Sequence, residues 1–183
     1  MTYTIKAIPT MYAGTQFRSR LEARWAAFFD LCGMKWEYEP FDCDGYVPDF
    51  LLYGKNRSAI AEVKPEPIFD EDDDQIVNGR AAARSFGYHF IVLLDRWKDH
   101  DVTDSWKTAG YIYQHLSYAP DFNEGLPCTL WSTEDGRLDF GAEDLASNSL
   151  HGEFCTPFEG KALQQRWRES GNIVQWQPRR KAA

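Results

Sequence analysis

The pattern of apolar and polar positions in the first half of the chain predicts a helix, three strands, a second helix and one more strand. Apolar side chains recur at helical spacing over residues 17–32, with Thr15 as the expected N-cap and Gly33 as the residue that ends the helix. A second helix is expected from residue 75 to about 85, before Gly87. This order is typical of a mixed α/β core.

Three short β-type segments follow the first helix, at residues 35–40, 46–53 and 58–64. The third segment ends at Pro65, which cannot donate a hydrogen bond to a sheet. A wholly apolar run at 90–94 is typical of a buried central strand. The acidic stretch 66–74 is interpreted as a solvated loop that leads into the second helix, since acids suit a helix N-terminus.

The second half of the chain has weaker patterns. We interpret the aromatic stretch 106–118 as a helix, and residues 129–140 as a hairpin that turns near Asp135. A last helix is expected at 161–170, ended by Gly171. The chain is therefore divided into a core over residues 1–125 and a C-terminal α+β extension over 126–183, in which a hairpin and a basic helix pack on the core.

Composition narrows the class of protein. The 183 residues are 43% hydrophobic and 15% aromatic, which excludes disorder throughout. No apolar run approaches the ~18 residues of a membrane span, and the first ten residues do not resemble a secretory signal. The four cysteines are widely spaced and include no CxxC pair, so a disulfide scaffold is not expected. We expect a cytoplasmic protein without membrane contact, in a bacterium or a phage-infected cell.

Charge is unevenly distributed. The chain has 20 basic and 28 acidic residues, a balance that argues against a general nucleic-acid binder. Residues 65–160 contain six basic and nineteen acidic side chains, whereas residues 161–183 contain six basic and one acidic. The basic end and the neutral front can still form a local positive groove, and the acidic segment is a candidate surface for a protein partner.

Two short segments carry the candidate chemistry. Side chains alternate along a strand, so Glu62 and Lys64 project from the same face. If residues 46–53 and 58–64 form a hairpin that turns at Lys55 and Asn56, Asp49 lies directly opposite Glu62. Two adjacent carboxylates need a proton or a cation at neutral pH. Oxygen ligands favour Mg²⁺ or a similar ion, although a one-residue slip of the strands would separate them.

The first helix supplies a third acid. At 100° per residue, Glu22 falls about 100° from Leu21, on the border of the buried face. Arg18 precedes Glu22 by four residues and is expected to pair with it. The alternative is an exposed Glu22 in a surface ion pair.

These residues together resemble the PD-(D/E)-x-K nuclease superfamily: an acid on the first helix, then Pro48-Asp49, then Glu62-Val63-Lys64. The run at 12–26, followed by Trp36-Glu-Tyr-Glu-Pro, is similar to a group of small nucleases of phages and bacteria. The likeness covers about residues 12–94 and implies a restriction-endonuclease-like αβββαβ core with a mixed central sheet. Pro65 departs from the pattern, which has a small residue after the lysine.

The resemblance implies a role for each residue. Asp49, Glu62 and the Val63 carbonyl would bind Mg²⁺ or Mn²⁺, and Glu22 would complete the metal shell directly or through water. Lys64 would orient the attacking water or stabilise the developing negative charge. The implied activity is a metal-dependent DNA endonuclease that leaves 5′-phosphate and 3′-hydroxyl ends, in phage or mobile-element DNA processing.

Several arginines are candidate contacts to nucleic-acid phosphates. They are Arg18, Arg80, Arg84, Arg166 and Arg168. Solvated surface positions are the alternative for the arginines on helices. Three other interpretations remain open for the whole chain: a catalytically silent nuclease-fold binding or anti-defence protein, an RNA nuclease, and a surface cluster of ion pairs at the predicted site. A homodimer is also left open.

Overall fold

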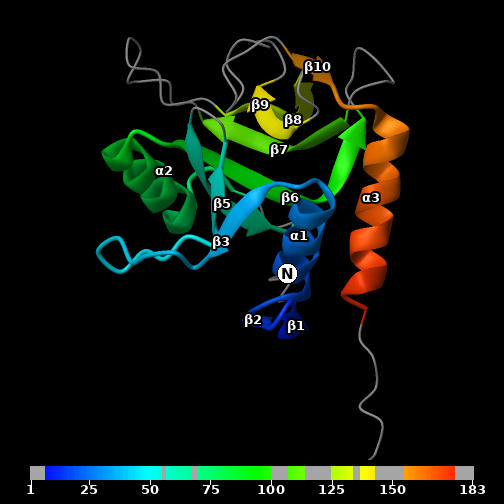
Figure 1. The fold of residues 1–183 in the computed structure, drawn as a ribbon. Coiled ribbons are helices and arrows are strands. Elements are labelled where there is room, and N and C mark those ends of the chain that lie inside the picture. Colours follow the sequence, from blue (N-terminus) through cyan, green and yellow to red (C-terminus); the bar gives the residue numbers. More distant parts are fainter. Residues whose placement is uncertain are drawn as a thin grey trace, which may run out of the picture.

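The computed structural model describes residues 7–54, 57–66, 70–99, 107–113, 125–133, 137–142 and 155–175. Its main feature is an eight-stranded sheet with the order β10-β8-β7-β6-β5-β4-β3, in which β9 pairs with β8. Helices α1 and α3 contact each other on one side of the sheet, and α2 packs against β5 and β6 on the other (Figure 1). Strands β5 and β6 are parallel and the other described pairings are antiparallel, so the protein is α/β with a mixed sheet.

The elements from α1 to β6 follow the order predicted from the apolar pattern, with shifted ends. They are α1 (Arg20–Leu31), β3 (Lys35–Tyr38), β4 (Phe50–Tyr53), β5 (Ser58–Lys64), α2 (Asp74–Phe86) and β6 (His89–Asp99). The acidic loop leads into α2 as expected, because the side chain of Asp73 accepts a hydrogen bond from the backbone of Gln75. Gly87 ends α2 in the left-handed conformation, at φ 70°.

Helix α1 begins later than predicted. Ser19, not Thr15, is its N-cap: Ser19 Oγ accepts a hydrogen bond of 3.1 Å from the Glu22 N–H. Thr15 instead begins strand β2 (Thr15–Phe17), which pairs with β1 (Thr10–Tyr12) across a turn at Ala13 and Gly14. The prediction failed because a short hairpin precedes the helix, whereas Gly33 follows its end at φ 67° as expected.

The register of β4 and β5 confirms the predicted hairpin. Phe50 lies opposite Ala61 and Leu51 opposite Ile60, so Asp49, one residue before β4, points to the same side of the sheet as Glu62. Strand β5 ends at Lys64, before Pro65, as predicted. The turn expected at residues 55 and 56 lies outside the described part of the chain.

The second half of the chain corrects two predictions and confirms a third. Residues 107–113 of the predicted helix 106–118 form a strand, because they pair with β6. The predicted hairpin is present, since β8 and β9 pair antiparallel; its turn at residues 134–136 lies outside the described residues. The last helix continues through Gly171. These elements are β7 (Lys107–Tyr113), β8 (Leu126–Thr133), β9 (Leu138–Ala142), β10 (Cys155–Pro157) and α3 (Gly160–Ile173).

Two apolar clusters cover the two sides of the sheet. Residues at alternate positions of β5, such as Ala61, belong to the cluster with α1, and Ile60 belongs to the cluster with α2. Trp25 on α1 is fully buried, its ring lies 4.6 Å from that of Trp167 on α3, and its indole N–H donates to the Leu94 carbonyl at 3.0 Å. This hydrogen bond joins α1 to the centre of the sheet.

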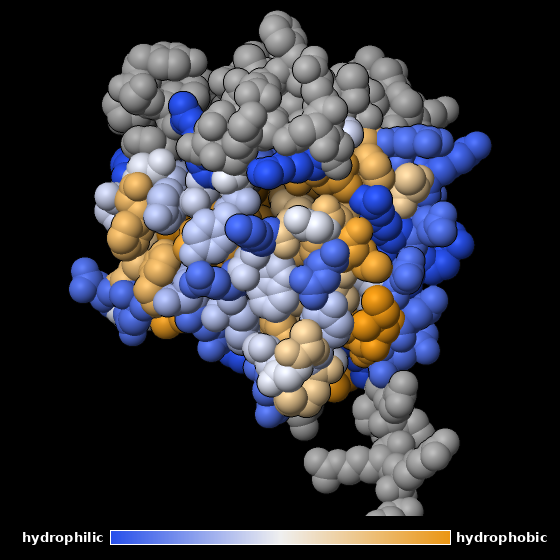
Figure 2. Space-filling model, viewed as in Figure 1, coloured by the Kyte–Doolittle hydropathy of each residue, from blue (hydrophilic) through white to orange (hydrophobic). Residues whose placement is uncertain are grey.

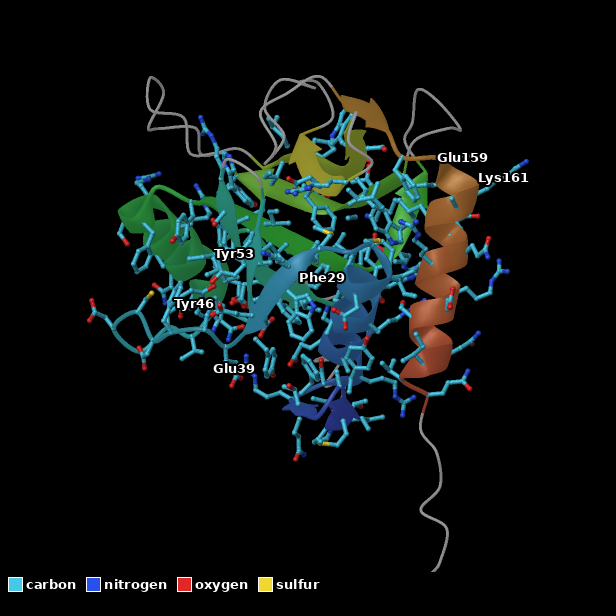
Figure 3. All side chains as sticks on the ribbon, viewed as in Figure 1. Phe29, Glu39, Tyr46, Tyr53, Glu159 and Lys161 are labelled. Atoms are coloured by element: carbon cyan, nitrogen blue, oxygen red, sulfur yellow. The ribbon has the colours of Figure 1, made fainter. Side chains whose placement is uncertain are left out.

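Polar and apolar side chains are interspersed on the face of the molecule seen in Figure 2. Among the described residues, no helix combines the length and the hydropathy that crossing a membrane requires. Figure 3 shows Tyr46 beside α2 and Glu39 on the segment after β3. The site described next lies between these two residues.

Candidate active site

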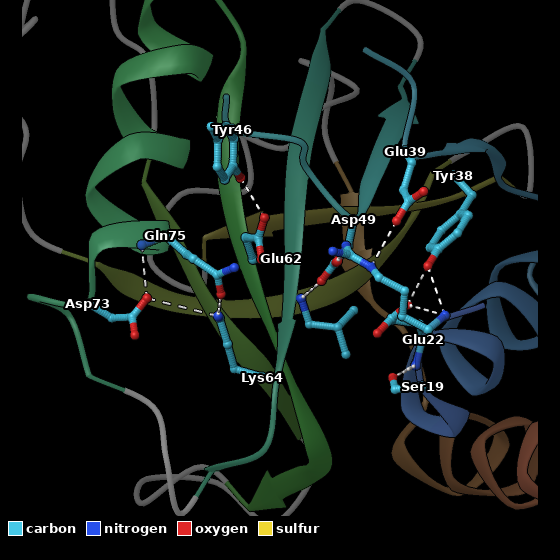
Figure 4. A network of polar contacts seen from close by, with 12 residues as sticks. Ser19, Glu22, Tyr38, Glu39, Tyr46, Asp49, Glu62, Lys64, Asp73 and Gln75 are labelled. Carbon is cyan, nitrogen blue, oxygen red and sulfur yellow. Dashed lines mark hydrogen bonds and ion pairs between the residues drawn. The ribbon is translucent and has the colours of Figure 1, made fainter. Parts of the chain in front are cut away.

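Three buried carboxyl groups come from three elements of the fold. Glu22 lies in the first turn of α1, Asp49 just before β4, and Glu62 on β5. Their exposed fractions are 7%, 5% and 3%. Figure 4 shows this region and the polar contacts within it. The sequence therefore predicted the acids that the fold brings together, including Glu22, which is buried and not a surface residue.

Asp49 is held by contacts to both of its carboxylate oxygens. Oδ2 accepts a hydrogen bond of 2.8 Å from the Val63 N–H, and Oδ1 accepts one of 2.6 Å from Arg18 Nη2. The first contact fixes the carboxylate against β5, where Glu62 precedes Val63. The second contact places the positively charged guanidinium of Arg18 against the Asp49 carboxylate.

Arg18 does not pair with Glu22 through its guanidinium, as the four-residue spacing predicted. Its Nε lies 2.8 Å from Glu39 Oε1 and its Nη2 contacts Asp49, while only its backbone N–H donates to Glu22 Oε2, at 3.1 Å. The reason is that Arg18 precedes the N-cap Ser19 and so is not part of the helical turn that favours such pairs.

Two tyrosines orient the other acids. The Tyr38 hydroxyl donates to Glu22 Oε2 at 2.6 Å, and the Tyr46 hydroxyl donates to Glu62 Oε1 at 2.6 Å. Sequence reasoning missed both tyrosines. One available signal was the position of Tyr38, which alternates with Trp36 on the strand next to the predicted Asp49 strand.

Lys64 shares a side of β5 with Glu62. Its Nζ donates a short hydrogen bond to Gln75 Oε1 and lies 4.0 Å from Asp73 Oδ1, and both partners are at the N-terminus of α2. The lysine side chain is 14% exposed. The cap residue of α2 and the residue two positions later thus hold the ammonium group at the side of the site that faces α2.

The site contains more negative groups than its cations neutralise. The pKa of Asp49 is raised well above its usual range, first by burial and then by the charges of Glu62 and Glu22, which outweigh the Val63 hydrogen bond and Arg18. Burial also raises the pKa of Glu62, against the opposing effects of the Tyr46 hydrogen bond, Lys64 and Arg18. Either a proton or an added cation would relieve this repulsion.

The predicted metal ligands are Asp49, Glu62, Glu22 and the Val63 carbonyl. In the described part of the chain, no three or more His, Cys, Asp or Glu side chains form a group that could hold a metal ion. The carboxylates contact Arg18 and tyrosine hydroxyls instead. The chemistry of the donors still fits a hard cation, because Asp49 and Glu62 supply neighbouring buried carboxylate oxygens with raised pKa.

Among the predicted phosphate contacts, Arg18 lies against the acids. The Arg80 guanidinium lies over the Tyr113 ring at 4.8 Å. Arg166 lies over the Phe158 ring at 4.7 Å and contacts Cys32 at the end of α1 remote from Glu22. Arg84 is in the last turn of α2 and Arg168 is exposed on α3. The role of these four arginines as phosphate contacts stays a prediction.

No protein-family model matches the chain, and neither a curated protein nor a solved structure shows significant similarity to it.

Proposed function

We propose that this protein is a metal-dependent DNA nuclease of the PD-(D/E)-x-K type. The observation that supports this most is the β4–β5 register, which puts Asp49 and Glu62 on one side of the sheet with Lys64 two residues further along β5. Burying two carboxyl groups together is unfavourable unless a cation or a proton compensates them. A site for a divalent ion explains why they lie there.

Each residue has a defined part in this proposal. Asp49 and Glu62 would hold Mg²⁺ or Mn²⁺ with the Val63 carbonyl, and Glu22 would complete the donor set directly or through water. The bound ion would polarise the scissile phosphate and lower the pKa of a water molecule. Lys64 donates a hydrogen bond to the water or to a phosphate oxygen, and Gln75 orients its ammonium group. Tyr46 restricts the Glu62 carboxylate to one orientation.

The test is a cleavage assay with purified protein on supercoiled, linear, branched and single-stranded DNA and on RNA. We expect cutting with Mg²⁺ or Mn²⁺, none with EDTA, and 5′-phosphate products. Asp49→Asn and Glu62→Gln should abolish cutting, and Lys64→Ala should slow it by about 10²–10³-fold. Glu37→Gln is the matched control, because Glu37 is an acid on neighbouring β3 whose contact is the exposed Tyr53 hydroxyl. Cutting that persists in EDTA would exclude the metal mechanism. Cutting of RNA alone would show that the substrate is RNA and not DNA.

The metal can also be tested without catalysis. Mg²⁺ should raise the melting temperature of the wild type, because a ligand that binds only the folded state stabilises it. The rise should be lost in Glu62→Gln and kept in Glu37→Gln. A wild-type melting temperature that does not respond even to a large excess of Mg²⁺ or Mn²⁺ would contradict the proposed ion site.

One observation favours a second candidate, a catalytically silent binding protein with the same core. All three carboxyl groups already have partners within the protein, in Arg18, Tyr38 and Tyr46. In that case these contacts serve stability alone, and the acidic segment 65–160 suits a basic protein partner. The absence of both cutting and ion binding in a folded wild-type protein would favour this candidate.

A further inference from the structure

The Arg18 guanidinium brings a positive charge to the buried Asp49 carboxylate. Its Nη2 lies 2.6 Å from Asp49 Oδ1 and its Nε lies 2.8 Å from Glu39 Oε1. The Asp49 side chain is only 8% exposed, whereas the Arg18 side chain is 53% exposed. The guanidinium therefore reaches from the surface onto a buried acid, and Glu39 supports it at the rim.

This contact competes with a divalent cation. The other oxygen of Asp49 accepts a hydrogen bond from the Val63 N–H, so both oxygens already have a partner. A cation bound to Asp49 would stand within a few ångströms of the guanidinium, and like charges that close repel each other. Arg18 and the cation thus stabilise the same carboxylate by the same electrostatic interaction.

The backbone of Arg18 is anchored independently of its guanidinium, since its N–H donates to Glu22 Oε2 at 3.1 Å and to the Tyr38 hydroxyl at 3.0 Å. The guanidinium itself is at the surface and is not part of the apolar core. A planar guanidinium binds phosphate through two parallel hydrogen bonds, so a nucleic-acid phosphate is a strong alternative partner.

We propose that Arg18 exchanges between Asp49 in the free protein and a phosphate of bound nucleic acid, and that this exchange frees Asp49 for the divalent cation. The inference rests on the proposed nuclease function. In this proposal Arg18 couples the binding of the two ligands. The free protein binds the cation weakly, and a phosphate of the nucleic acid draws the guanidinium away from Asp49. Glu39 keeps the guanidinium at the mouth of the site in the free state.

The first experiment measures Mn²⁺ binding by isothermal titration calorimetry without nucleic acid. Arg18→Ala should bind Mn²⁺ about tenfold more tightly than the wild type, within the range of coupling between two ligands. Arg18→Gln, which removes the charge and keeps an amide donor, should do the same and serves if the alanine variant does not fold. Arg96→Ala is the control, because Arg96 is 59% exposed and also contacts two acids, Glu66 and Asp95. Its Mn²⁺ affinity should equal that of the wild type.

The second experiment measures binding of a fluorescently labelled DNA duplex in EDTA by anisotropy. Arg18→Ala should bind the duplex about 3–10-fold more weakly, since one phosphate contact is lost. Opposite changes in Mn²⁺ and DNA affinity are the signature of exchange. An arginine that only supports Asp49 would weaken Mn²⁺ binding when removed.

The outcomes separate this inference from the proposed function. If Arg18→Ala binds Mn²⁺ no more tightly than the wild type, or binds the duplex equally well, the exchange is wrong, and the nuclease proposal stands as long as the wild type cuts DNA. If no folded variant binds Mn²⁺, both proposals fail.

Discussion

Substituting Gly79 by alanine should destabilise the protein, although the same change in most helices is stabilising. Gly79 is a buried residue of α2. A Cβ atom built there would lie 2.3 Å from Phe90 Cε2 and 2.6 Å from the Tyr46 hydroxyl oxygen. Neither neighbour can withdraw easily, because Phe90 is in the core on β6 and Tyr46 is hydrogen-bonded to Glu62.

The expected size follows from two opposing effects. Overpacking a core costs about 1–3 kcal/mol, and contacts this short belong near the upper end of that range. Replacing glycine by alanine in a helix recovers about 1 kcal/mol. The free energy of unfolding should therefore fall by about 1–2 kcal/mol. For a chain of this size the melting temperature should fall by roughly 2–8 °C.

Urea unfolding followed by circular dichroism measures this change. The comparison is Gly171→Ala in α3, where the three atoms nearest to the new Cβ belong to the Arg24 guanidinium, at 3.2–3.3 Å. These contacts are longer than those at Gly79, although the guanidinium is held by a 2.9 Å hydrogen bond to the Trp167 carbonyl, so Gly171→Ala should lower stability less than Gly79→Ala. If Gly79→Ala proves as stable as the wild type, the packing of α2 against Tyr46 and Phe90 is not as described. A loss of the proposed nuclease activity in Gly79→Ala would further indicate that Tyr46 positions Glu62.

Two other changes test the buried polar groups. Tyr46→Phe should lower the free energy of unfolding by about 1–3 kcal/mol, because the Glu62 carboxylate loses a buried donor at 2.6 Å. The control in the same denaturation assay is Tyr53→Phe, which removes an exposed hydroxyl contact to Glu37 and should lower the free energy of unfolding by less than about 0.5 kcal/mol. Equal losses in the two variants would contradict the burial of the Tyr46 contact. Asp139 is 5% exposed, and burial raises its pKa from 3.8 to about 7. Between these values the folded state binds more protons than the unfolded state, so this group should lower wild-type stability by about 2–3 kcal/mol from pH 5 to pH 8, and the total fall should be smaller by that amount in Asp139→Asn. Identical pH profiles for wild type and variant would refute this assignment.

The local pattern of the chain was sufficient to predict the strands that carry the site. Strand alternation and the position of Pro65 predicted β5. The register of a hairpin that turns at residues 55 and 56 predicted that Asp49 lies beside Glu62. These features depend on residues close in sequence. The contact of Arg18 with Asp49 joins residues 31 positions apart, and such a pair cannot be predicted from the local apolar pattern.

Strand β7 shows why the second half was harder to predict. Its residues became a strand because β6 and β8 pair with it on both sides, which is a tertiary effect that overrides local preference. Gly110 reveals the closeness of this packing, since a Cβ there would lie 1.9 Å from the Val92 carbonyl oxygen. Such a requirement for glycine is visible only once the neighbouring strand is in place.

The hydrogen bond from the Trp25 indole to the Leu94 carbonyl has a consequence for the chemistry at the other side of the sheet. Leu94 is paired in register with Lys64, and Trp25 lies on the same helix as Glu22, three residues further along. This interior hydrogen bond therefore ties the helix that carries Glu22 to the residue of β6 that lies beside Lys64, so the core helps to fix the distance between the helical acid and the lysine.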